Sequence, residues 1–280
     1  MRLAIDLGGT NIRIGQVDGG VVINRKSVAC PSGESEEKVM QQLLQLIEEM
    51  MKGASVEGIG IGVPSVVDAR HGIVYNVNNI PSWKEVHLKA RLETAFSVPV
   101  AVNNDSNCFA LGEKKFGLGI PYNNMVGITL GTGVGAGIII DDRLYGGRHT
   151  GAGEVGALPY LDADFETYCS TPFFTKSCGV PAKEVARRAS EGDVEAQALW
   201  RSFGTHLGQL FKALLFAYDP QAIVVGGGIS SVFSLYEKAM WEAMADFPYP
   251  AMLRDVKVLV SQNPDISMLG ASALLDEPCE

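Results

Sequence analysis

Residues 1–20, MRLAIDLGGTNIRIGQVDGG, contain two short segments of alternating apolar residues separated by a glycine turn. The alternation predicts a strand over 2–7, a tight turn and then a second strand. Gly8 and Gly9 permit backbone angles that other residues resist, and they let a ligand approach bare N–H groups. Asp6 stands just before the turn as an acceptor without an obvious donor. Taken alone, this stretch favours an ordinary glycine hairpin with an exposed aspartate.

Two later segments repeat the junction of a strand with a glycine turn. They are LGTGVGAG at 130–137 and VVGGGIS at 224–230. Three such junctions at the ends of apolar strands in an α/β chain indicate one ligand that is approached from several sides. We predict strands at 2–7, 12–17 and 20–27, and further strands within 56–65, 98–105, 123–141, 222–230 and 256–262. We predict helices at 35–53, 106–117 and 193–217. Two more helices are expected, one that ends near Met244 and one that begins at about 268.

Composition narrows the class of protein. The chain has 280 residues, of which 46% are hydrophobic and 20% charged, and this predicts a soluble protein with two domains. No apolar stretch approaches the roughly 18 residues that span a bilayer, and no signal peptide is visible. Five scattered cysteines without C-x-x-C spacing indicate free thiols in a reducing cytoplasm. The net charge of −9 argues against a nucleic-acid partner, whose binding needs a basic patch.

The glycine turns match neither the dinucleotide-binding motif nor the P-loop, and they fit a hairpin turn that binds phosphate. GTGVGA at 131–136 matches G-x-G-x-x-A, but the residues that follow are too few and too β-branched for the helix which that motif requires. No G-x-x-x-x-G-K-[ST] sequence occurs, so a P-loop enzyme is excluded. A hairpin turn can still hold phosphate with backbone N–H groups, and Thr10 and Thr132 add hydroxyl donors. Asp6 beside such a turn predicts a Mg²⁺ ion between carboxylate and phosphate.

The motifs carry a family resemblance over nearly the whole chain. DLGGT, LGTGVGAG and VVGGGIS resemble the phosphate-1, phosphate-2 and adenosine motifs of the sugar kinase/actin/Hsp70 ATPase fold. NNIPSW (78–83), NNDSNCFALGE (103–113), GAGEVG (151–156) and FETYCS (165–170) are similar to segments of the ROK family within that superfamily. The ROK family comprises bacterial sugar kinases and sugar-responsive repressors. The segments occur in the family's order, so the match is specific.

The resemblance implies an α/β fold of two ribonuclease-H-like (actin-like ATPase) domains with a central cleft between them. We expect an N-terminal domain over 1–107, joined by a C-terminal helix over 268–280, and a C-terminal domain over 108–267. The cleft would bind a hexose on one side and ATP with Mg²⁺ on the other. The family often forms dimers, so we expect a homodimer.

Site residues follow from matching positions to the family's motifs. Asp105 matches the catalytic base, and a carboxylate at a helix N-terminus is stabilised as an anion that can take the proton of a sugar hydroxyl. The residue also fits a helix N-cap, and it could do both. The residues that match sugar-binding positions are Asn79, Asn104, Glu154 and Glu166. Those that match phosphate-binding positions are Gly8, Gly9, Thr10, Asn11, Gly131, Thr132 and Gly133, and those for adenosine are Gly226, Gly227 and Gly228. Asp6 matches the residue that holds Mg²⁺, directly or through water.

The sequence departs from the family pattern at two places. After GAGEVG the family carries a histidine and then a cysteine-rich hairpin, which together bind a structural zinc. Here Ala157 replaces the histidine and the hairpin is missing. We therefore predict no structural zinc and, because that histidine also reaches the sugar, an altered selectivity of the pocket. Asn11 stands where many relatives carry lysine, so Mg²⁺ would neutralise more of the phosphate charge.

The resemblance implies ATP-dependent phosphorylation of a hexose at its 6-hydroxyl, in the cytoplasm. The alternatives are a sugar-responsive regulator, a non-catalytic sugar-binding protein and an actin- or Hsp70-like ATPase. The regulator would carry a helix-turn-helix ahead of the first strand, and the binding protein would not need both Asp6 and Asp105. The ATPase would not need the sugar-type residues around Asp105. ATP and polyphosphate both remain candidate donors, and no single hexose is favoured.

Overall fold

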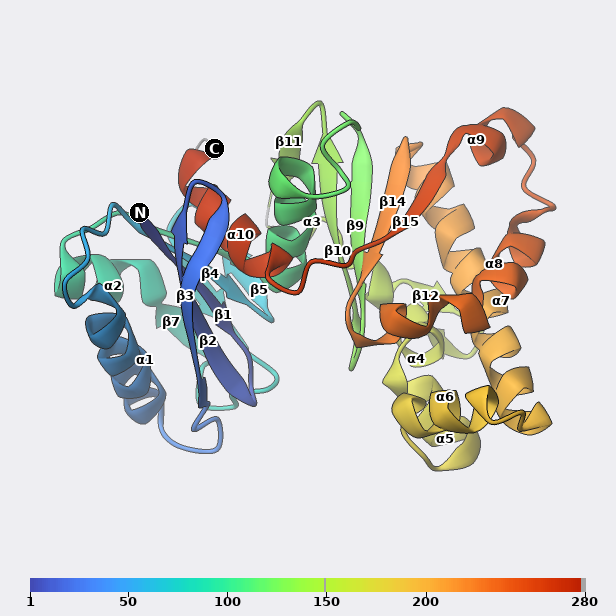
Figure 1. The fold of residues 1–280 in the computed structure, drawn as a ribbon, viewed down its shortest axis with the longest axis horizontal. Coiled ribbons are helices and arrows are strands. Elements are labelled where there is room, and N and C mark those ends of the chain that lie inside the picture. The colour runs from blue at the N-terminus through green and yellow to red at the C-terminus, as the bar shows by residue number, and fades with distance from the viewer. Residues whose placement is uncertain (149, 278–280) are drawn as a thin grey trace.

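Two five-stranded sheets form the framework of the described chain, residues 1–148 and 150–277 of a computed structural model (Figure 1). The strands are β1 (Arg2–Leu7), β2 (Asn11–Asp18), β3 (Val21–Ala29), β4 (Ile59–Val63) and β8 (Val100–Asn104) in the first sheet, and β9 (Met125–Leu130), β10 (Val134–Ile140), β11 (Arg143–Tyr145), β14 (Ala222–Gly226) and β15 (Lys257–Val260) in the second. Their orders are β3-β2-β1-β4-β8 and β11-β10-β9-β14-β15. In each sheet the earliest strand pairs antiparallel with the next strand and parallel with a later one. The two sheets therefore share one topology, in agreement with the repeated strand and turn pattern of the sequence.

The predicted first helix is confirmed as α1 (Glu36–Met51). The hydroxyl of Ser35 accepts the N–H of Lys38, which satisfies one of the free donors at the helix N-terminus. Glu36 and Glu37 occupy the first turn, where negative charge is favourable. One face of α1 is buried in the same hydrophobic cluster as β1, β2 and β4.

A small antiparallel sheet extends the first half of the chain. It consists of β5 (Val66–Asp68), β6 (Ile73–Tyr75) and β7 (Glu85–His87), and it leads into α2 (Leu88–Phe96). The sequence analysis did not predict this sheet, because strands of three residues are too short to show an alternating pattern. Between β6 and β7 the chain turns back on itself, and the indole of Trp83 is fully buried there.

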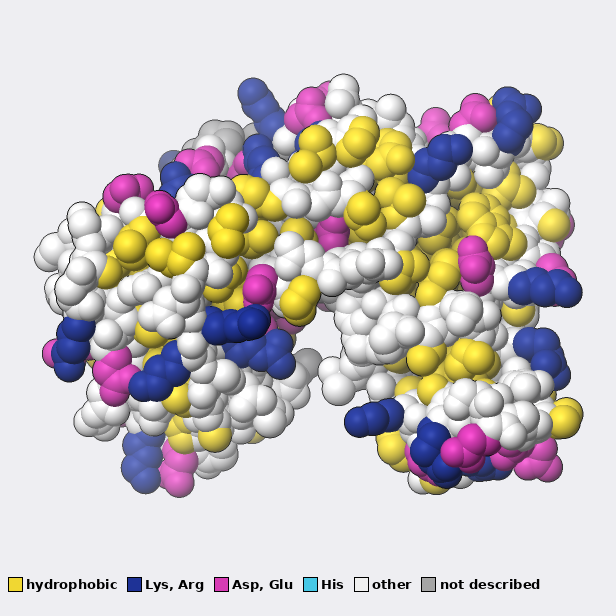
Figure 2. Space-filling view, in the orientation of Figure 1, with side chains coloured by type: hydrophobic (Ala, Val, Ile, Leu, Met, Phe, Trp, Pro, Cys, Tyr) yellow, Lys and Arg dark blue, Asp and Glu magenta, His cyan; other side chains and the backbone are white. Residues whose placement is uncertain are grey.

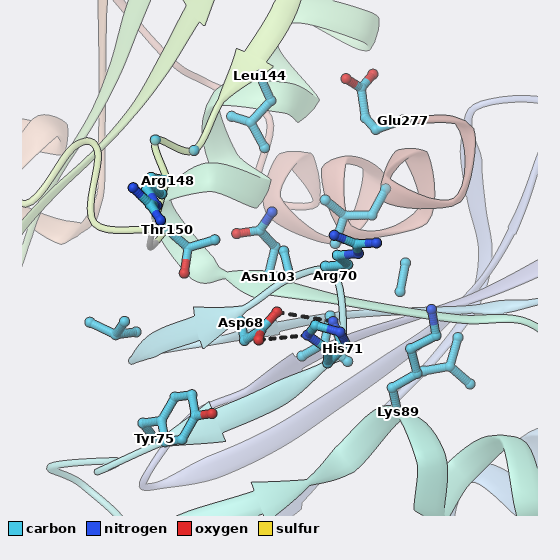
Figure 3. A pocket seen from close by; sticks show the side chains of 18 of the residues that line it. Asp68, Arg70, His71, Tyr75, Lys89, Asn103, Leu144, Arg148, Thr150 and Glu277 are labelled. Carbon is cyan, nitrogen blue, oxygen red and sulfur yellow. Dashed lines mark hydrogen bonds and ion pairs between the residues drawn. The ribbon is translucent and has the colours of Figure 1, made fainter. Parts of the chain in front are cut away.

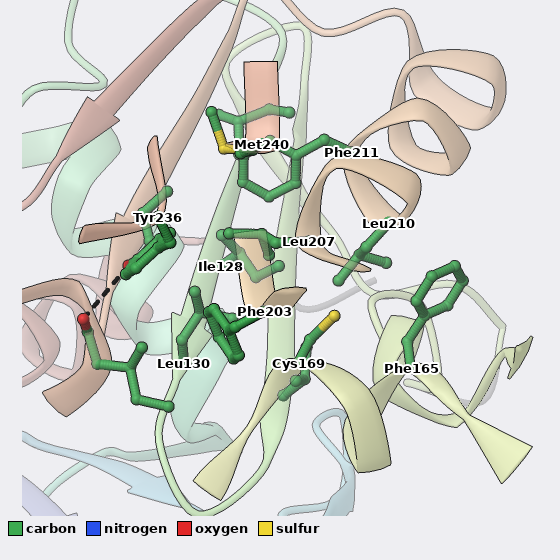
Figure 4. Packing of buried hydrophobic residues seen from close by; sticks show 14 of the residues in the cluster. Ile128, Leu130, Phe165, Cys169, Phe203, Leu207, Leu210, Phe211, Tyr236 and Met240 are labelled. Carbon is green, nitrogen blue, oxygen red and sulfur yellow. Dashed lines mark hydrogen bonds between the residues drawn. The ribbon is translucent and has the colours of Figure 1, made fainter. Parts of the chain in front are cut away.

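The second sheet is covered by helices. They are α4 (Phe165–Cys169), α5 (Thr171–Cys178), α6 (Ala182–Ser190), α7 (Val194–Tyr218), α8 (Glu237–Met244) and α9 (Pro250–Asp255), with 3₁₀ turns η1 (Val155–Ala157) and η2 (Gly228–Leu235). The predicted long helix is confirmed as α7, which begins after the capping side chain of Asp193. Figure 4 shows Phe203 and Leu207 of α7 packed near Ile128 and Leu130 of β9, within one buried cluster. This packing fixes the sheet that carries the second glycine turn.

Two helices lie between the sheets (Figure 1). They are α3 (Asp105–Phe116), which packs on β9 and β10, and α10 (Ile266–Ala273), which packs on β1 and β4 and against α3. Glycines allow this close approach. A Cβ at Gly270 would lie 1.7 Å from the carbonyl oxygen of Cys108, and one at Gly112 would lie 2.0 Å from that of Ile266. The α3–α10 pair therefore joins the two halves of the chain, and it places the start of α3 at the junction.

Below this junction, Figure 2 shows a cleft between the two halves. The expected domain boundary at 107/108 falls inside α3, and α10 is followed by a 3₁₀ turn, η3 (Leu274–Asp276). Residues 278–280 of the expected C-terminal helix lie outside the described residues. The division into 1–107 with 268–280 and 108–267 stays a prediction. Among the described residues, no helix is both long and apolar enough to cross a membrane.

Candidate functional site

Asp105 lies where β8 ends and α3 begins, at the edge where the parallel strands β1, β4 and β8 terminate. The side chain of Asn104 caps the helix: its Oδ1 accepts the N–H of Ser106 at 2.8 Å and that of Asn107 at 3.3 Å. The N–H of Ser106 also donates to Oδ1 of Asp105 at 2.8 Å. One carboxylate oxygen of Asp105 is thus held by the helix N-terminus, and Oδ2 accepts no hydrogen bond from the described residues.

Asn104 has a structural task that limits its role as a ligand. Its Oδ1 already accepts two hydrogen bonds, and its Nδ2 donates to the carbonyl oxygen of Ser65 at 3.2 Å. An amide has two donor hydrogens, so one N–H of Asn104 is left for a ligand. The expected contact between Asn104 and a sugar hydroxyl stays a prediction.

Carboxylates from distant parts of the chain act on one another at this edge. The pKa of Asp105 is raised to about 6. Burial is the largest cause, the charges of Asp6 and Glu154 act in the same direction, and hydrogen bonds from Ser106 oppose the shift. Burial likewise raises the pKa of Asp6. The pKa of Glu154 is raised by burial and by the charge of Glu166. A half-buried carboxylate with a near-neutral pKa, grouped with other acids, is typical of an acid–base site.

Arg13 belongs to this site, and the sequence analysis missed it. In the β1–β2 hairpin Arg13 stands directly opposite Asp6, so the two side chains share one face of the sheet. Nη1 of Arg13 lies 3.6 Å from Oδ2 of Asp6, and its charge opposes the burial effect on the pKa of Asp6. The signal was available, since both residues lie equally far from the turn. A cation therefore stands near the first glycine turn, although Asn11 is neutral.

The first glycine turn differs from the expectation in one respect. Neither Gly8 nor Gly9 has a positive φ, so the turn does not need glycine for its backbone angles. Gly9 is needed for space: a Cβ there would lie 2.3 Å from Cβ of Asn79 and 2.8 Å from its carbonyl oxygen. The N–H of Gly8 donates to the carbonyl oxygen of Asn11 at 2.9 Å, whereas Thr10 is exposed. The turn and the Asn79 loop, both expected at the ligand, are thus in contact.

The second glycine turn, Gly131–Gly133, is built on the start of α4 and α5. The carbonyl oxygen of Gly131 accepts both the N–H and the hydroxyl of Thr171, each at 2.9 Å. Oε2 of Glu166 accepts the N–H of Val134 at 3.1 Å, and a Cβ at Gly133 would lie 2.5 Å from that oxygen. Glu166, expected at the sugar, therefore packs against the turn that we expected at phosphate.

The three glycines at 226–228 have different reasons for being glycine. A Cβ at Gly226 would lie 2.4 Å from the ring of Phe109. Gly227 has φ +84°, and a Cβ there would lie 2.3 Å from the carbonyl oxygen of Leu130. A Cβ at Gly228 would meet nothing within 4 Å. Packing and backbone conformation explain the first two, and only Gly228 opens onto free space that a ligand could fill.

An aromatic cluster follows Ala157, where the family carries its zinc hairpin. Ala157 is exposed at the end of η1, and a short ribbon of β12 (Pro159–Tyr160) and β13 (Ala163–Asp164) comes next. Tyr160 stacks on Phe165 with ring centroids 4.3 Å apart, and its hydroxyl lies 3.0 Å from Nδ1 of His206 on α7. Within 1–148 and 150–277, no group of three or more His, Cys, Asp or Glu side chains is arranged to hold a metal ion.

The residues at the first turn fit a magnesium ion that arrives with a nucleotide. Mg²⁺ uses one or two carboxylates and completes its shell with water and substrate phosphates, so it does not need a dedicated cluster of protein ligands. The Asp6 side chain is 31% exposed, and its negative charge is close enough to raise the pKa of Asp105. A cation between these carboxylates and a phosphate group would offset their mutual repulsion.

Comparison with known proteins agrees with this geometry. The chain matches the ROK family model over residues 2–277. A glucokinase of Thermotoga maritima is 26% identical over 308 residues, covering 98% of this chain and 97% of that protein. An N-acetyl-D-glucosamine kinase of Vibrio cholerae is 30% identical over 267 residues, covering 85% and 87%. Xylose repressors are also among the similar proteins.

A solved structure extends the comparison to three dimensions. The crystal structure of a ROK family glucokinase from Streptomyces griseus in complex with glucose and AMPPNP matches with a TM-score of 0.81 at 27% identity, covering 98% of each chain. Glucokinase and N-acetylglucosamine kinase relatives together support a sugar kinase. The chain belongs to the ROK family, and it has the two-domain, actin-like ATPase fold of that family's sugar kinases.

Proposed function

We propose that the protein transfers the terminal phosphoryl group of ATP to the 6-hydroxyl of a hexose. The observation that carries this proposal is the placement of Asp105. Its half-buried carboxylate has a pKa of about 6 and stands at a helix N-terminus, close enough to Asp6 and Glu154 for their charges to act on it. The similarity to glucokinases supports the same reaction.

Asp105 acts as the general base in this proposal. A base whose pKa is close to neutral is largely ionised at cellular pH and still accepts a proton readily. The N–H of Ser106 holds Oδ1, which leaves Oδ2 to face the sugar hydroxyl. The hydrogen bonds of Asn104 to α3 and to Ser65 fix the backbone that carries Asp105. The base is thus oriented before substrate arrives, which lowers the entropic cost of reaction.

The phosphate end is formed by the two glycine turns. The N–H groups of Gly8 and Gly131 are used inside the turns, where they donate to the carbonyl oxygens of Asn11 and Gly133. The other backbone N–H groups of the two turns and the hydroxyls of Thr10 and Thr132 donate to phosphate oxygens. Arg13 adds a positive charge beside Asp6. Mg²⁺, held by Asp6 directly or through water, supplies charge neutralisation at the transferring phosphate. Adenosine lies against Gly228, where the structure leaves free space.

The sugar end is formed by Asn79, Glu154 and Glu166, with the free N–H of Asn104. Amide and carboxylate groups suit a polyol because each can form directional bonds with one or two hydroxyls. The short exposed side chain of Ala157 supplies no hydrogen bond there. We therefore expect weaker discrimination among glucose, mannose and N-acetylated hexoses at the side that Ala157 faces.

A hexose panel with a matched variant tests the reaction. ADP release with MgATP would be measured for glucose, mannose, fructose, allose, N-acetylglucosamine and N-acetylmannosamine. Wild type should turn over at least one sugar, and Asp105→Asn should lower kcat by about 10²–10⁴-fold while still binding it. Asp255→Asn, at an exposed aspartate on α9, serves as control and should match wild type. Full activity of Asp105→Asn would refute the assignment of the base.

A non-catalytic or regulatory sugar-binding protein is the second candidate. The loss of the family histidine at Ala157 and the xylose repressor relatives favour it. Sugar binding without turnover of any hexose, with either ATP or polyphosphate as donor, would support it over the kinase. In that case Ala157→His is the first variant to make, because it restores the missing hydrogen-bond partner.

The same proposal includes a cytoplasmic homodimer. The chain carries four free cysteines among its described residues, and sugar kinases are among its relatives. Light scattering coupled to gel filtration would give the mass in solution. A mass of one chain at micromolar concentration would overturn the dimer and leave the proposed reaction untouched.

A further inference from the structure

A cavity of about 640 Å³ lies between the two halves of the chain, apart from the candidate site. Its walls come from the loop after β5, from α2, β8 and β11, from the loop that follows β11 and from the chain after η3. Neither Asp6, Asp105 nor Glu154 lines it. Its volume is within the roughly 300–1,000 Å³ that is usual for small-molecule sites.

Positive charge is concentrated in this cavity. The cationic side chains in its walls are Arg70, Lys89, Arg143 and Arg148. Within the described part of the chain, none of the four forms an ion pair with a carboxylate, whereas the two acids in the walls have partners. Oδ2 of Asp68 is hydrogen-bonded to Nδ1 of His71 at 2.8 Å, which is an ion pair only when that imidazole is protonated, and Glu277 pairs with Lys115 at 3.1 Å. A chain with a net charge of −9 therefore carries a local excess of unpaired cations.

These cations come from both halves of the chain. Arg70 and Lys89 belong to the first half, on the loop after β5 and on α2, and Arg143 and Arg148 belong to the β11 segment of the second. Figure 3 shows Arg70 and Arg148 on opposite sides of Asn103. Like charges that face one cavity repel each other, and a concave surface of one sign concentrates the field that attracts an oppositely charged ligand.

Asn103 also lines the cavity, and its side chain has a donor that the described residues leave free. Asn103 is only 7% exposed. Its Oδ1 accepts the N–H of Asn104 at 2.8 Å and the Nδ2–H of Asn107 at 2.9 Å. Its own Nδ2 donates to no acceptor among the described residues, and this atom is accessible rather than fully buried. A ligand in the cavity would supply the missing acceptor.

We propose that this cavity binds a phosphate monoester, with the dianionic phosphate held by the four cations and an oxygen of the ligand accepting from Nδ2 of Asn103. Guanidinium groups match phosphate because they donate two parallel hydrogen bonds to its oxygens. The cavity is larger than a phosphate ion, so it has room for the organic part of the ester. Because the cations belong to both halves, a bound ligand links the halves at a site separate from the proposed reaction.

Direct binding measurements test the proposal. Titration calorimetry would be done with glucose 6-phosphate, inorganic phosphate and uncharged glucose as probes. The cleft would be filled beforehand with excess hexose and a non-hydrolysable MgATP analogue. We expect wild type to bind a phosphate probe and Arg70→Gln and Arg143→Gln each to weaken binding about tenfold. Arg201→Gln, at an exposed arginine of α7 outside the cavity, is the matched control and should bind as wild type does.

The two phosphate probes separate the possible occupants. Tighter binding of the ester supports the proposal, whereas equal binding of both probes identifies inorganic phosphate as the ligand and overturns the ester. Absence of binding, binding unchanged in both arginine variants, or displacement of the probe by the nucleotide analogue would each overturn the site. One further result would overturn the site. If wild type binds no phosphate probe and Arg70→Gln has a lower mass in solution than wild type, the cavity is part of a protein interface. Every readout is binding or mass, so failure of the kinase proposal does not affect the result.

Discussion

At Asp105, burial and neighbouring carboxylates change the pKa in the same direction. The charge is costly to keep in the folded protein, and the same cost makes the carboxylate a better base. Hydrogen bonds from Ser106 offset part of this cost at one oxygen. The residue is therefore both destabilising and suited to proton transfer, which is a common compromise at active sites.

The pH dependence of turnover should report this carboxylate. Because the base must be deprotonated, we expect kcat/KM for the sugar to rise as pH increases through about 6 and then to level off. In Glu154→Gln a charge that raises the pKa of Asp105 is removed, so its acid limb should move to lower pH. Initial rates across a pH series give both curves. A variant limb at the same or higher pH would contradict this electrostatic coupling.

Stability should depend on the same group with a defined sign. The pKa of Asp105 in the folded protein, about 6, lies above its ordinary value of 3.8, so the folded state binds more protons between these values. The free energy of unfolding therefore falls as pH rises through this window. Asp105→Asn has no such titration, so its free energy of unfolding should exceed that of wild type by about 1–3 kcal/mol at neutral pH. The difference should be smaller near pH 4.5. Urea unfolding of both proteins at the two pH values checks this, with Asp255→Asn as control.

Arg13 should act on the phosphate end through Asp6. Arg13→Gln removes the charge that lowers the pKa of Asp6, so more of that carboxyl will be protonated at low pH. We expect a higher KM for MgATP, a larger defect at pH 6 than at pH 8 and an unchanged KM for the sugar. Arg254→Gln, on exposed α9, should leave all three unchanged. An increase in KM for MgATP of equal size at both pH values would show that Arg13 does not act through the protonation of Asp6.

Among the elements, the first hairpin and the Asn79 loop depend on each other. They come from different sheets, and they touch because Gly9 has no Cβ. The second turn is supported differently, by Thr171 and Glu166 from the segment that follows the aromatic ribbon. Each turn is thus fixed by a segment that we also expect at the sugar. If these segments bind sugar and phosphate as we propose, the two subsites are in direct contact.

Gly9→Ala tests the contact between the first turn and the Asn79 loop. The new Cβ would lie 2.3 Å from Cβ of Asn79, so the loop must move. We expect a loss of about 1–3 kcal/mol in unfolding free energy and a higher KM for the sugar. Gly33→Ala is the control, because a Cβ there meets nothing within 4 Å. Wild-type stability of Gly9→Ala, measured by urea unfolding, would show that the loop adjusts freely.

At the scale of the whole molecule, the α3–α10 pair joins the two halves. It connects β1 and β4 on one side to β9 and β10 on the other, and α3 carries Asp105 at its first residue. The helices approach so closely that glycine is required at Gly112 and Gly270. Asp105 therefore stands at a closely packed junction, and the glycine turns lie on the sheets to either side.

Gly270→Ala should destabilise both halves together. Its Cβ would lie 1.7 Å from the carbonyl oxygen of Cys108, which is backbone and cannot move without shifting α3. We expect a loss of about 3 kcal/mol or more and reduced turnover, since Asp105 moves with the helix. Thermal unfolding followed by circular dichroism measures the first effect. Gly151→Ala, where a Cβ meets nothing within 4 Å, should keep the wild-type melting temperature.

Much of the fold and part of the site could be predicted from sequence, because those features are local. The β1–β2 hairpin, the Ser35 cap and the long helix α7 follow from alternation, capping residues and apolar periodicity within short windows. The same hairpin already placed Arg13 opposite Asp6, although we did not draw that conclusion. Asp105 and the glycine turns could be identified by motif matching because each motif is also a short, continuous stretch of sequence.

Tertiary structure alone decided how these parts act on each other. The raised pKa of Asp105 depends on burial and on charges that lie far away in the sequence. The need for glycine at Gly9 depends on Asn79, and the placement of Glu166 depends on Gly133. The cationic cavity exists only because the α3–α10 pair brings the two halves together. Desolvation, close contact and Coulomb interaction are functions of distance in space, and local sequence patterns do not specify that distance.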